Sequence, residues 1–158
     1  MKIFQFLVSI FLLLILINNS FANISCRQPP LKQKEARVFI MNFYNSLLNS
    51  KKGGLFIYKK YFIDGKSTSI VNNHYSSAKE FKKHAIFLVD SKVDKNFKLL
   101  KIISNNRNIF VKSILEYSHK KYLFFAYYEL NQCNKILHFE ELSMPLTKGA
   151  PNDIGYKS

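Results

Sequence analysis

The sequence predicts an α+β domain in which three N-terminal helices pack on a mostly antiparallel sheet. In the first half of the chain, apolar residues recur at spacings of three and four, which is typical of amphipathic helices. In the second half, segments rich in Ile, Val, Phe and Tyr are separated by short Asn-rich or His-Lys-Lys turns, which is typical of strands. Because the helices precede the strands, we expect the helices to lie together on one face of the sheet.

Residues 1–22 have the layout of a secretory signal. Lys2 supplies a positive charge, and the segment from Ile3 to Ile17 is almost entirely apolar. Ser20 and Ala22 are small residues at the positions where signal peptidase requires them. The apolar run of about 15 residues is shorter than the roughly 20 that a spanning helix needs, although a retained anchor stays the alternative. We therefore expect cleavage after Ala22 and an exported protein, periplasmic or secreted.

The chain is strongly basic. It has 24 Lys and Arg against 10 Asp and Glu, a formal net charge of +14 over 158 residues. Such an excess attracts anionic partners, of which an anionic membrane surface is one. The lysines and arginines are scattered in short groups and no nucleic-acid-binding motif accompanies them. A generally basic surface is therefore favoured over a nucleic-acid-binding stripe, and nucleic acid is not an expected partner.

The two cysteines, Cys26 and Cys133, predict a disulfide if the chain is exported. Intermolecular pairing or free thiols are the alternatives. A metal site would need more ligands near each cysteine, and the four histidines are not paired at helical spacing, so no metal site is expected. No serine-nucleophile motif or phosphate-binding glycine loop occurs either, and we expect no cofactor.

The first helix is predicted over residues 32–52, after an N-terminal arm, residues 23–30, that ends in two prolines. Proline cannot lie inside a helix, so the helix begins after the arm. A Gly-Gly pair ends the predicted helix. Its apolar face consists of Ala36, Phe39, Ile40, Phe43, Tyr44, Leu47 and Leu48.

Two shorter helices are predicted next. Residues 55–63 are expected to be helical up to a turn at Asp64-Gly65. Residues 66–77 are polar and loop-like, with room for one short strand. The third helix is predicted over residues 77–91, whose first and fourth residues, Ser and Glu, have the spacing of a capping box.

Four strands and a tail complete the chain. The strands are predicted over residues 97–106, 108–118, 120–131 and 134–144. The tail, residues 147–158, has Gly, Pro and Asn and little apolar content, so we expect it to be poorly ordered.

Two local motifs within residues 31–146 carry a resemblance to a known family. Tyr61-Phe62-Ile63-Asp64 looks like the aromatic segment that ends the second helix of that family, and Asn134-Lys135-Ile136 followed by Glu141 looks like the opening of its last strand. With the order of elements, these motifs resemble the nuclear-transport-factor-type superfamily, which includes SnoaL-like proteins. The resemblance implies a curved sheet that forms a cone with the helices. The mouth of such a cone takes a small apolar ligand. Alternatively, side chains fill the cone and the domain serves only for association with a partner.

The last strand supplies the first candidate site residues. Strand alternation places Leu137, Phe139, Glu141 and Ser143 on one face. If that face looks into the cone, Glu141 is a carboxylate among aromatic rings and a candidate general acid or base. A solvated glutamate at the strand end, or a structural partner for a lysine, is the alternative. The expected pocket residues are Phe43 and Leu47 from the first helix, with Leu137 and Phe139.

The resemblance adds two further catalytic candidates. Tyr44 stands roughly where the isomerases of the superfamily place a tyrosine that donates to an oxyanion, although a core tyrosine is the alternative. Asp64 could act as a base at the mouth, but Asp-Gly is above all a turn signal. Residues 66–69 offer no carboxylate where those isomerases keep their base, and Phe124 occupies the place of their second acid. Steroid-isomerase chemistry is therefore not expected.

The strand at residues 120–131 is apolar on both faces, which suggests that a second subunit covers the face away from the helices. A buried core without dimerisation is the alternative. Taken together, these patterns predict a binding or association module whose partner is a small apolar ligand or an envelope protein. A cofactor-independent lyase or isomerase of the SnoaL type is one alternative function, and a periplasmic component of a secretion system is another.

Overall fold

The computed structural model describes residues 26–49, 51–91 and 95–148. The predicted signal peptide, residues 23–25 of the arm and the tail after Lys148 lie outside these residues. The elements in chain order are α2 (Gln33–Asn49), α3 (Gly54–Tyr61), β1 (Thr68–Val71), β2 (His74–Ser76), α4 (Ala78–Asp90), β3 (Lys95–Asn105), β4 (Asn108–Tyr117), β5 (Lys120–Leu130) and β6 (Ile136–Pro145).

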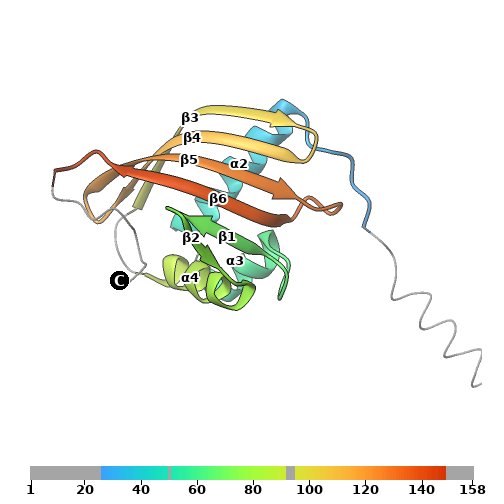
Figure 1. Cartoon of the computed structure of the whole chain (residues 1–158), viewed down its shortest axis with the longest axis horizontal. Coiled ribbons are helices and arrows are strands. Elements are labelled where there is room, and N and C mark those ends of the chain that lie inside the picture. The colour runs from blue at the N-terminus through green and yellow to red at the C-terminus, as the bar shows by residue number, and fades with distance from the viewer. Residues whose placement is uncertain (1–25, 50, 92–94, 149–158) are drawn as a thin grey trace, which may run out of the picture.

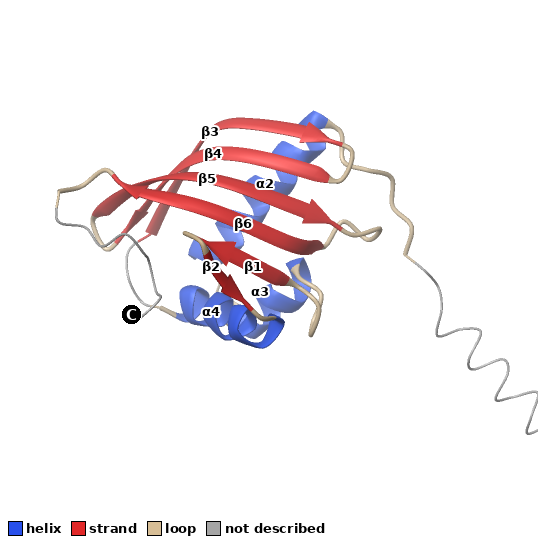
Figure 2. Ribbon diagram, viewed as in Figure 1, coloured by secondary structure: helices blue, strands red, loops and turns tan. Residues whose placement is uncertain are grey.

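The strands form one sheet in the order β2-β1-β6-β5-β4-β3. All neighbouring pairs are antiparallel except β1 and β6, which run parallel. The helices lie on one side of this sheet, and the long strands curve over them (Figures 1 and 2). The predicted α+β class, with three helices before a mostly antiparallel sheet, is confirmed. No helix among the described residues is both long enough and apolar enough to cross a membrane.

Helix α2 packs one face against the sheet, as its apolar spacing predicts. Its buried residues recur at intervals of three or four, which places them on one side of the helix. They are Ala36, Ile40, Phe43 and Tyr44. Gln33 also fastens the start of the helix to the edge strand β3, because its side chain donates to the carbonyl of Ile102 at 2.7 Å and accepts from the amide of Ser104 at 2.8 Å.

Helices α3 and α4 pack closely against each other. The first helix ends at Asn49, earlier than the predicted end at the Gly-Gly pair, and the pair instead begins α3, with Gly53 as its N-cap and Gly54 as its first residue. A Cβ atom at Gly54 would lie 2.6 Å from the backbone oxygen of Ile86 in α4. The predicted capping box at the start of α4 is confirmed, with the Ser77 hydroxyl accepting from the amide of Glu80 and the Glu80 carboxylate accepting from the amide of Ser77.

The segment predicted as a polar loop with room for one strand contains two, β1 and β2. They form a hairpin whose turn residues, Asn72 and Asn73, have positive φ angles of 48° and 68°. Asparagine tolerates this left-handed conformation better than most residues, which makes a two-residue turn possible. Strand β1 then pairs with β6 and extends the sheet.

A β-bulge in β6 corrects the predicted strand faces. Leu130 pairs with Ile136, whereas the preceding Glu129 pairs with His138, so the register shifts by one residue. Ile136 is therefore fully buried and Leu137 is only partly buried, the reverse of the simple alternation. Beyond the bulge, Phe139, Glu141 and Ser143 share the face toward the helices as predicted, because they pair with the buried residues of β5.

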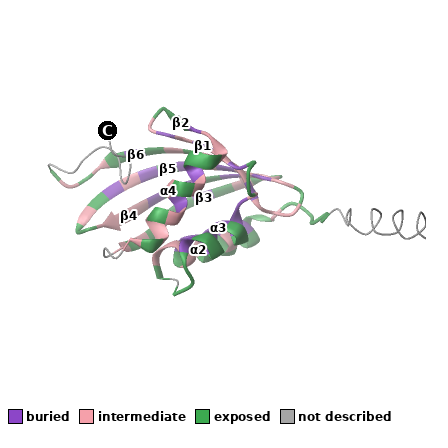
Figure 3. Cartoon of the chain, turned by 90° about the horizontal axis from the view of Figure 1, so that it is seen from below, coloured by how far each residue is buried: buried purple, intermediate pink, exposed green. Residues whose placement is uncertain are grey.

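The core lies between the helices and the inner face of the sheet. In β5, buried positions alternate with less buried ones (Figure 3). The buried positions of that strand are Tyr122, Phe124, Ala126, Tyr128 and Leu130. Much of the core is aromatic, with rings of α2 and α3 meeting edge to face, such as Phe43 and Tyr61 at 5.1 Å between centroids.

Candidate functional site

A cavity of about 90 Å³ lies between the helices and the inner face of the sheet. Five of the sequence-predicted residues line it: Phe43, Tyr44, Leu47, Phe139 and Glu141. The predicted pocket residue Leu137 does not line it, because the bulge in β6 moves that side chain off the inner face. The other lining residues are Leu48, Phe62, Val71, Phe81, His84, Ala85, Leu88, Lys95, Leu115, Tyr117 and Phe124.

Tyr44 is held in place by its neighbours in the core. Its hydroxyl lies 2.7 Å from the hydroxyl of Tyr128, and its ring stacks on Phe97 with centroids 3.8 Å apart. Tyr44 is 6% exposed and Tyr128 is fully buried. The hydrogen bond between the two hydroxyls uses only one of their two hydrogens. When Tyr128 donates this bond, the hydroxyl hydrogen of Tyr44 is available to the cavity that Tyr44 lines.

Both phenols stay protonated at neutral pH. Burial raises the pKa of Tyr44 well above its usual value near 10, and the negative charge of Glu141 raises it further, while the hydrogen bond with Tyr128 lowers it. Burial likewise raises the pKa of Tyr128, with the neighbouring Tyr44 adding to the effect. Tyr44 can therefore act as a neutral hydrogen-bond donor in the cavity, and not as a base.

Glu141 stands on the inner face of the sheet. It pairs across the strands with the buried Ala126 of β5, and its partly buried side chain lines the cavity. Its charge acts on both tyrosines of the hydroxyl pair, since it raises the pKa of each. A carboxylate and a phenol donor thus share one largely apolar cavity, which is the combination that recognises or polarises a small oxygen-containing molecule.

Three further polar residues line the cavity and were not among the predicted site residues: His84, Lys95 and Tyr117. The sequence pattern could have indicated His84, because its spacing places it on the apolar face of α4 with Phe81, Ala85 and Leu88. Lys95 and Tyr117 lie at paired ends of β3 and β4. Their position in the cavity depends on how those strand ends meet α4.

Lys95 also closes the end of α4. Its ammonium group donates to the backbone carbonyls of Leu88 and Ser91, the latter at 3.0 Å. A cation at this position satisfies carbonyl groups that the helix leaves unpaired. Burial lowers the pKa of Lys95, whereas the charge of nearby Asp90 raises it.

Asp64 lies outside the cavity. It is exposed in the turn after α3 and its carboxylate accepts a hydrogen bond from the ammonium of Lys82 at 2.7 Å. This hydrogen bond is the main reason that the pKa of Asp64 is lowered. The structure therefore supports the turn interpretation of Asp64, because a general base at the mouth of the cavity would have to line it.

The two cysteines are free thiols in the structure, so the predicted disulfide is not formed there. They are nevertheless neighbours, since the thiol of Cys133 lies 3.2 Å from the backbone oxygen of Cys26. The arm is tied to the β5–β6 turn near them by a hydrogen bond from the amide of Gln28 to the carbonyl of Gln132 at 2.8 Å. The disulfide stays a prediction for oxidising conditions.

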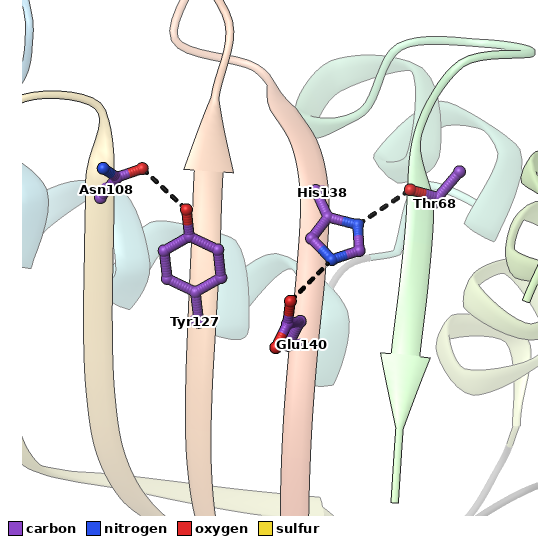
Figure 4. A network of polar contacts seen from close by, with 5 residues as sticks. All are labelled: Thr68, Asn108, Tyr127, His138 and Glu140. Atoms are coloured by element: carbon purple, nitrogen blue, oxygen red, sulfur yellow. Dashed lines mark hydrogen bonds and ion pairs between the residues drawn. The ribbon is translucent and has the colours of Figure 1, made fainter. Parts of the chain in front are cut away.

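The outer face of the sheet carries a separate polar network (Figure 4). One ring nitrogen of His138 lies 2.9 Å from the hydroxyl of Thr68, and the other lies 3.1 Å from the carboxylate of Glu140. On the same face, Tyr127 donates to the side-chain oxygen of Asn108 at 2.9 Å. Glu140 is about half exposed, so its pair with His138 contributes at most about 1 kcal/mol to stability.

An open groove of about 630 Å³ crosses this outer face. Several large apolar side chains of the face are 40% to 51% exposed: Ile103, Phe110, Phe125, Leu142 and Met144. Strand β5 is therefore covered on its inner face only. The homodimer that the two-sided strand suggests stays a prediction, and this is the face that a second copy would cover.

The described part of the chain holds no group of three or more His, Cys, Asp or Glu side chains placed to bind a metal ion.

No model of a protein family matches the chain, and no curated protein matches it.

Solved structures do resemble it. An NTF2-like protein of unknown function from Silicibacter pomeroyi has a TM-score of 0.53 at 10% identity, over 72% of this chain and 100% of the other. A SnoaL-like protein of unknown function from Burkholderia thailandensis has a TM-score of 0.54 at 10% identity, over 73% and 98%. A steroid delta-isomerase from Pseudomonas aeruginosa has a TM-score of 0.53 at 10% identity, over 75% and 85%. At such low identity the likeness is one of fold alone. The chain therefore has the NTF2-like fold, with three helices followed by a six-stranded, mostly antiparallel sheet.

Proposed function

We propose that this protein is an exported binding module that captures a small, mostly apolar molecule in the cavity between its helices and its sheet. The observation that carries the proposal is the composition of the cavity wall. Aromatic and aliphatic side chains form most of it, and Tyr44 and Glu141 place a hydroxyl donor and a carboxylate acceptor in the same space. Ligand sites are typically apolar with a few polar groups that orient the ligand.

The volume limits the ligand. About 90 Å³ is several times what one water molecule needs on the same measure, roughly 10–15 Å³. It is also smaller than the roughly 300–1,000 Å³ of a pocket for a drug-sized ligand. The expected ligand is therefore a molecule of a few non-hydrogen atoms, or the apolar end of a longer one, with one oxygen that reaches Tyr44 or Glu141.

Filling the cavity should abolish binding. Ala85 lines the cavity from α4 and is 6% exposed, so the larger side chain of Ala85→Leu would occupy the space. We expect phenol and toluene to raise the melting temperature of the unchanged protein, with a stabilisation of about 1.4 kcal/mol at a ligand concentration ten times Kd. The same ligands should leave the melting temperature of Ala85→Leu unchanged in a thermal-shift titration.

The matched control is Ala78→Leu, which makes the same change on the same helix outside the cavity. This control should keep the full thermal shift. If Ala85→Leu is folded by circular dichroism and still gains stability from both ligands, the binding site is elsewhere and the proposal is wrong.

A cofactor-independent lyase or isomerase is a second candidate, because Glu141 and Tyr44 line one cavity. In such a reaction the Glu141 carboxylate removes a proton from the carbon next to a carbonyl group. The hydroxyl of Tyr44 donates a hydrogen bond to the enolate oxygen, and the proton returns to a different carbon as the double bond moves. The proton and the electron pair are conserved, so no further reactant is needed.

Adjacent glutamates on opposite faces of β6 make a matched test of this second candidate. Glu141→Gln should lower the rate of double-bond migration in a small β,γ-unsaturated cyclic ketone, followed by absorbance, at least about a hundredfold. Glu140→Gln removes the same charge from the outer face and should keep the rate. Equal rates in the two variants, or no turnover by the unchanged protein, would remove the enzyme hypothesis and leave ligand capture standing.

A further inference from the structure

The solvent side of helix α3 combines large apolar side chains with lysines. Leu55 is 45% exposed and Phe56 is 50% exposed. Lys59 and Lys60 follow four residues later and are also exposed. Because helix residues four apart share a face, each apolar side chain has a lysine beside it. The buried residues of α3 are Gly54, Ile57, Tyr58 and Tyr61.

Aromatic rings and ammonium groups are in contact on this surface. The ammonium of Lys52 lies 4.6 Å from the ring centroid of Phe56, and that of Lys60 lies 4.8 Å from the ring centroid of Tyr61. Both distances are within the range of cation–π attraction. Leu55, Phe56, Lys52, Lys59 and Lys60 together are called the α3 surface below.

The charged residues of the segment that contains the α3 surface are all basic. Residues 51–63 contain four lysines and no acidic residue. Lys135 of the β5–β6 turn adds another ammonium, which donates to the backbone carbonyl of Lys59 at 2.9 Å.

Two carboxylates of the described residues lie next to α3. Asp90 accepts a hydrogen bond from the amide of Gly54 at 2.7 Å, and Asp64 pairs with Lys82 at 2.7 Å. The four lysines of residues 51–63 outnumber these two carboxylates, so the region keeps a net positive charge beside two exposed apolar side chains.

We propose that the α3 surface docks on an anionic lipid bilayer, with Leu55 and Phe56 entering the interfacial layer and the lysines contacting the lipid phosphates. Lysines on flexible stems can keep their ammonium groups at the headgroups while apolar neighbours enter the membrane interface. A nucleic acid would satisfy the lysines, but it would leave the exposed leucine without an apolar environment. The combination of apolar and basic side chains is therefore matched by a bilayer better than by any polyphosphate in water.

The absence of tryptophan from the chain allows a local test. Phe56→Trp places a single fluorescent reporter on the α3 surface, and Phe110→Trp places one at a residue of nearly equal exposure, 49%, on the outer face of the sheet. The full chain is titrated with phosphatidylcholine vesicles with and without phosphatidylglycerol. We expect emission from position 56 to move to shorter wavelength, and brominated lipids to quench it, only when phosphatidylglycerol is present. Emission from position 110 should not change.

Charge variants separate the local surface from the overall basic charge. In the Phe56→Trp background, Lys59→Gln with Lys60→Gln should weaken partitioning about fivefold per lysine, since each lysine near the membrane surface contributes about 1 kcal/mol. Lys98→Gln with Lys101→Gln removes the same charge from exposed positions of β3 and should have a much smaller effect. Raising the salt concentration should weaken the binding of the unchanged surface.

Three outcomes would overturn the proposal. The first is that vesicles bind the chain while emission from position 56 stays unchanged, which would place the contact elsewhere, including the apolar segment at residues 3–17. The second is equal loss of binding in the two lysine pairs, which would make the effect one of overall charge. The third is a single-stranded oligonucleotide that shifts emission from position 56 and displaces the vesicles, which would favour nucleic acid as the partner.

Discussion

Replacing Gly54 by alanine is expected to destabilise the protein by about 2 to 3 kcal/mol and to lower its melting temperature by about 8 °C. Helix propensity alone predicts the opposite sign, because alanine is a better helix former than glycine by about 1 kcal/mol. At this position the steric clash of the new Cβ costs more free energy than the gain in helix propensity. The new Cβ would lie 2.6 Å from the backbone oxygen of Ile86 and 2.7 Å from its Cα, and backbone atoms cannot rotate away.

Separating α3 from α4 would also stretch the hydrogen bond from the Gly54 amide to Asp90. Urea unfolding of the full chain, followed by circular dichroism, measures the change. Gly53→Ala is the matched control, because its nearest atom would be the carboxylate oxygen of Asp90 at 3.8 Å, an ordinary contact. If Gly54→Ala proves as stable as Gly53→Ala, the two helices pack less closely than the structure shows.

Oxidation is expected to join Cys26 to Cys133 and to raise the free energy of unfolding by about 4 kcal/mol, because the bond closes a loop of about 106 residues. The geometry favours this pairing, since the two cysteines are neighbours and the arm is fastened beside them. Reaction without a catalyst should be slow at neutral pH. The neighbouring Cys26, and then burial, raises the pKa of the Cys133 thiol, so little of it is the reactive thiolate.

The protein is incubated in a glutathione redox buffer and then analysed by thiol titration, intact mass and guanidinium unfolding. The expected product is a monomer that has lost both thiols and two hydrogens and that unfolds at a higher denaturant concentration. Cys133→Ser should show no dependence of stability on the redox buffer. Disulfide-linked dimers, or glutathione adducts without an internal bond, would contradict the prediction.

Local patterns were sufficient for the elements that have strong periodicity. The spacing of apolar residues located α2, and the Ser77 and Glu80 pair located the start of α4, because a helix places residues three and four apart on one side. The four long strands were likewise predicted close to their observed bounds. The hairpin at residues 68–76 was predicted only in part, because its short strands are half polar and become strands through pairing with β6.

Only part of the candidate site was predicted, because some of its residues meet only through contacts between distant segments. Tyr44 was selected from the resemblance to the superfamily and Glu141 from strand alternation read with that resemblance, and both line the cavity. Leu137 was placed wrongly because one inserted residue in β6 reverses the alternation. His84 and Lys95 come from α4 and β3, and only the packing of these elements makes them neighbours of Glu141 in the cavity wall.

The sequence by itself determined which segments are helices and long strands and which side of the first helix faces inward, because side-chain periodicity is a property of neighbouring residues. The tertiary structure decided the register of β6, the close approach of Gly54 to α4, the meeting of Cys26 with Cys133 and the polar residues that share one cavity. These features depend on contacts between residues far apart in the chain, and a one-residue shift or a change in packing alters them without changing the local pattern.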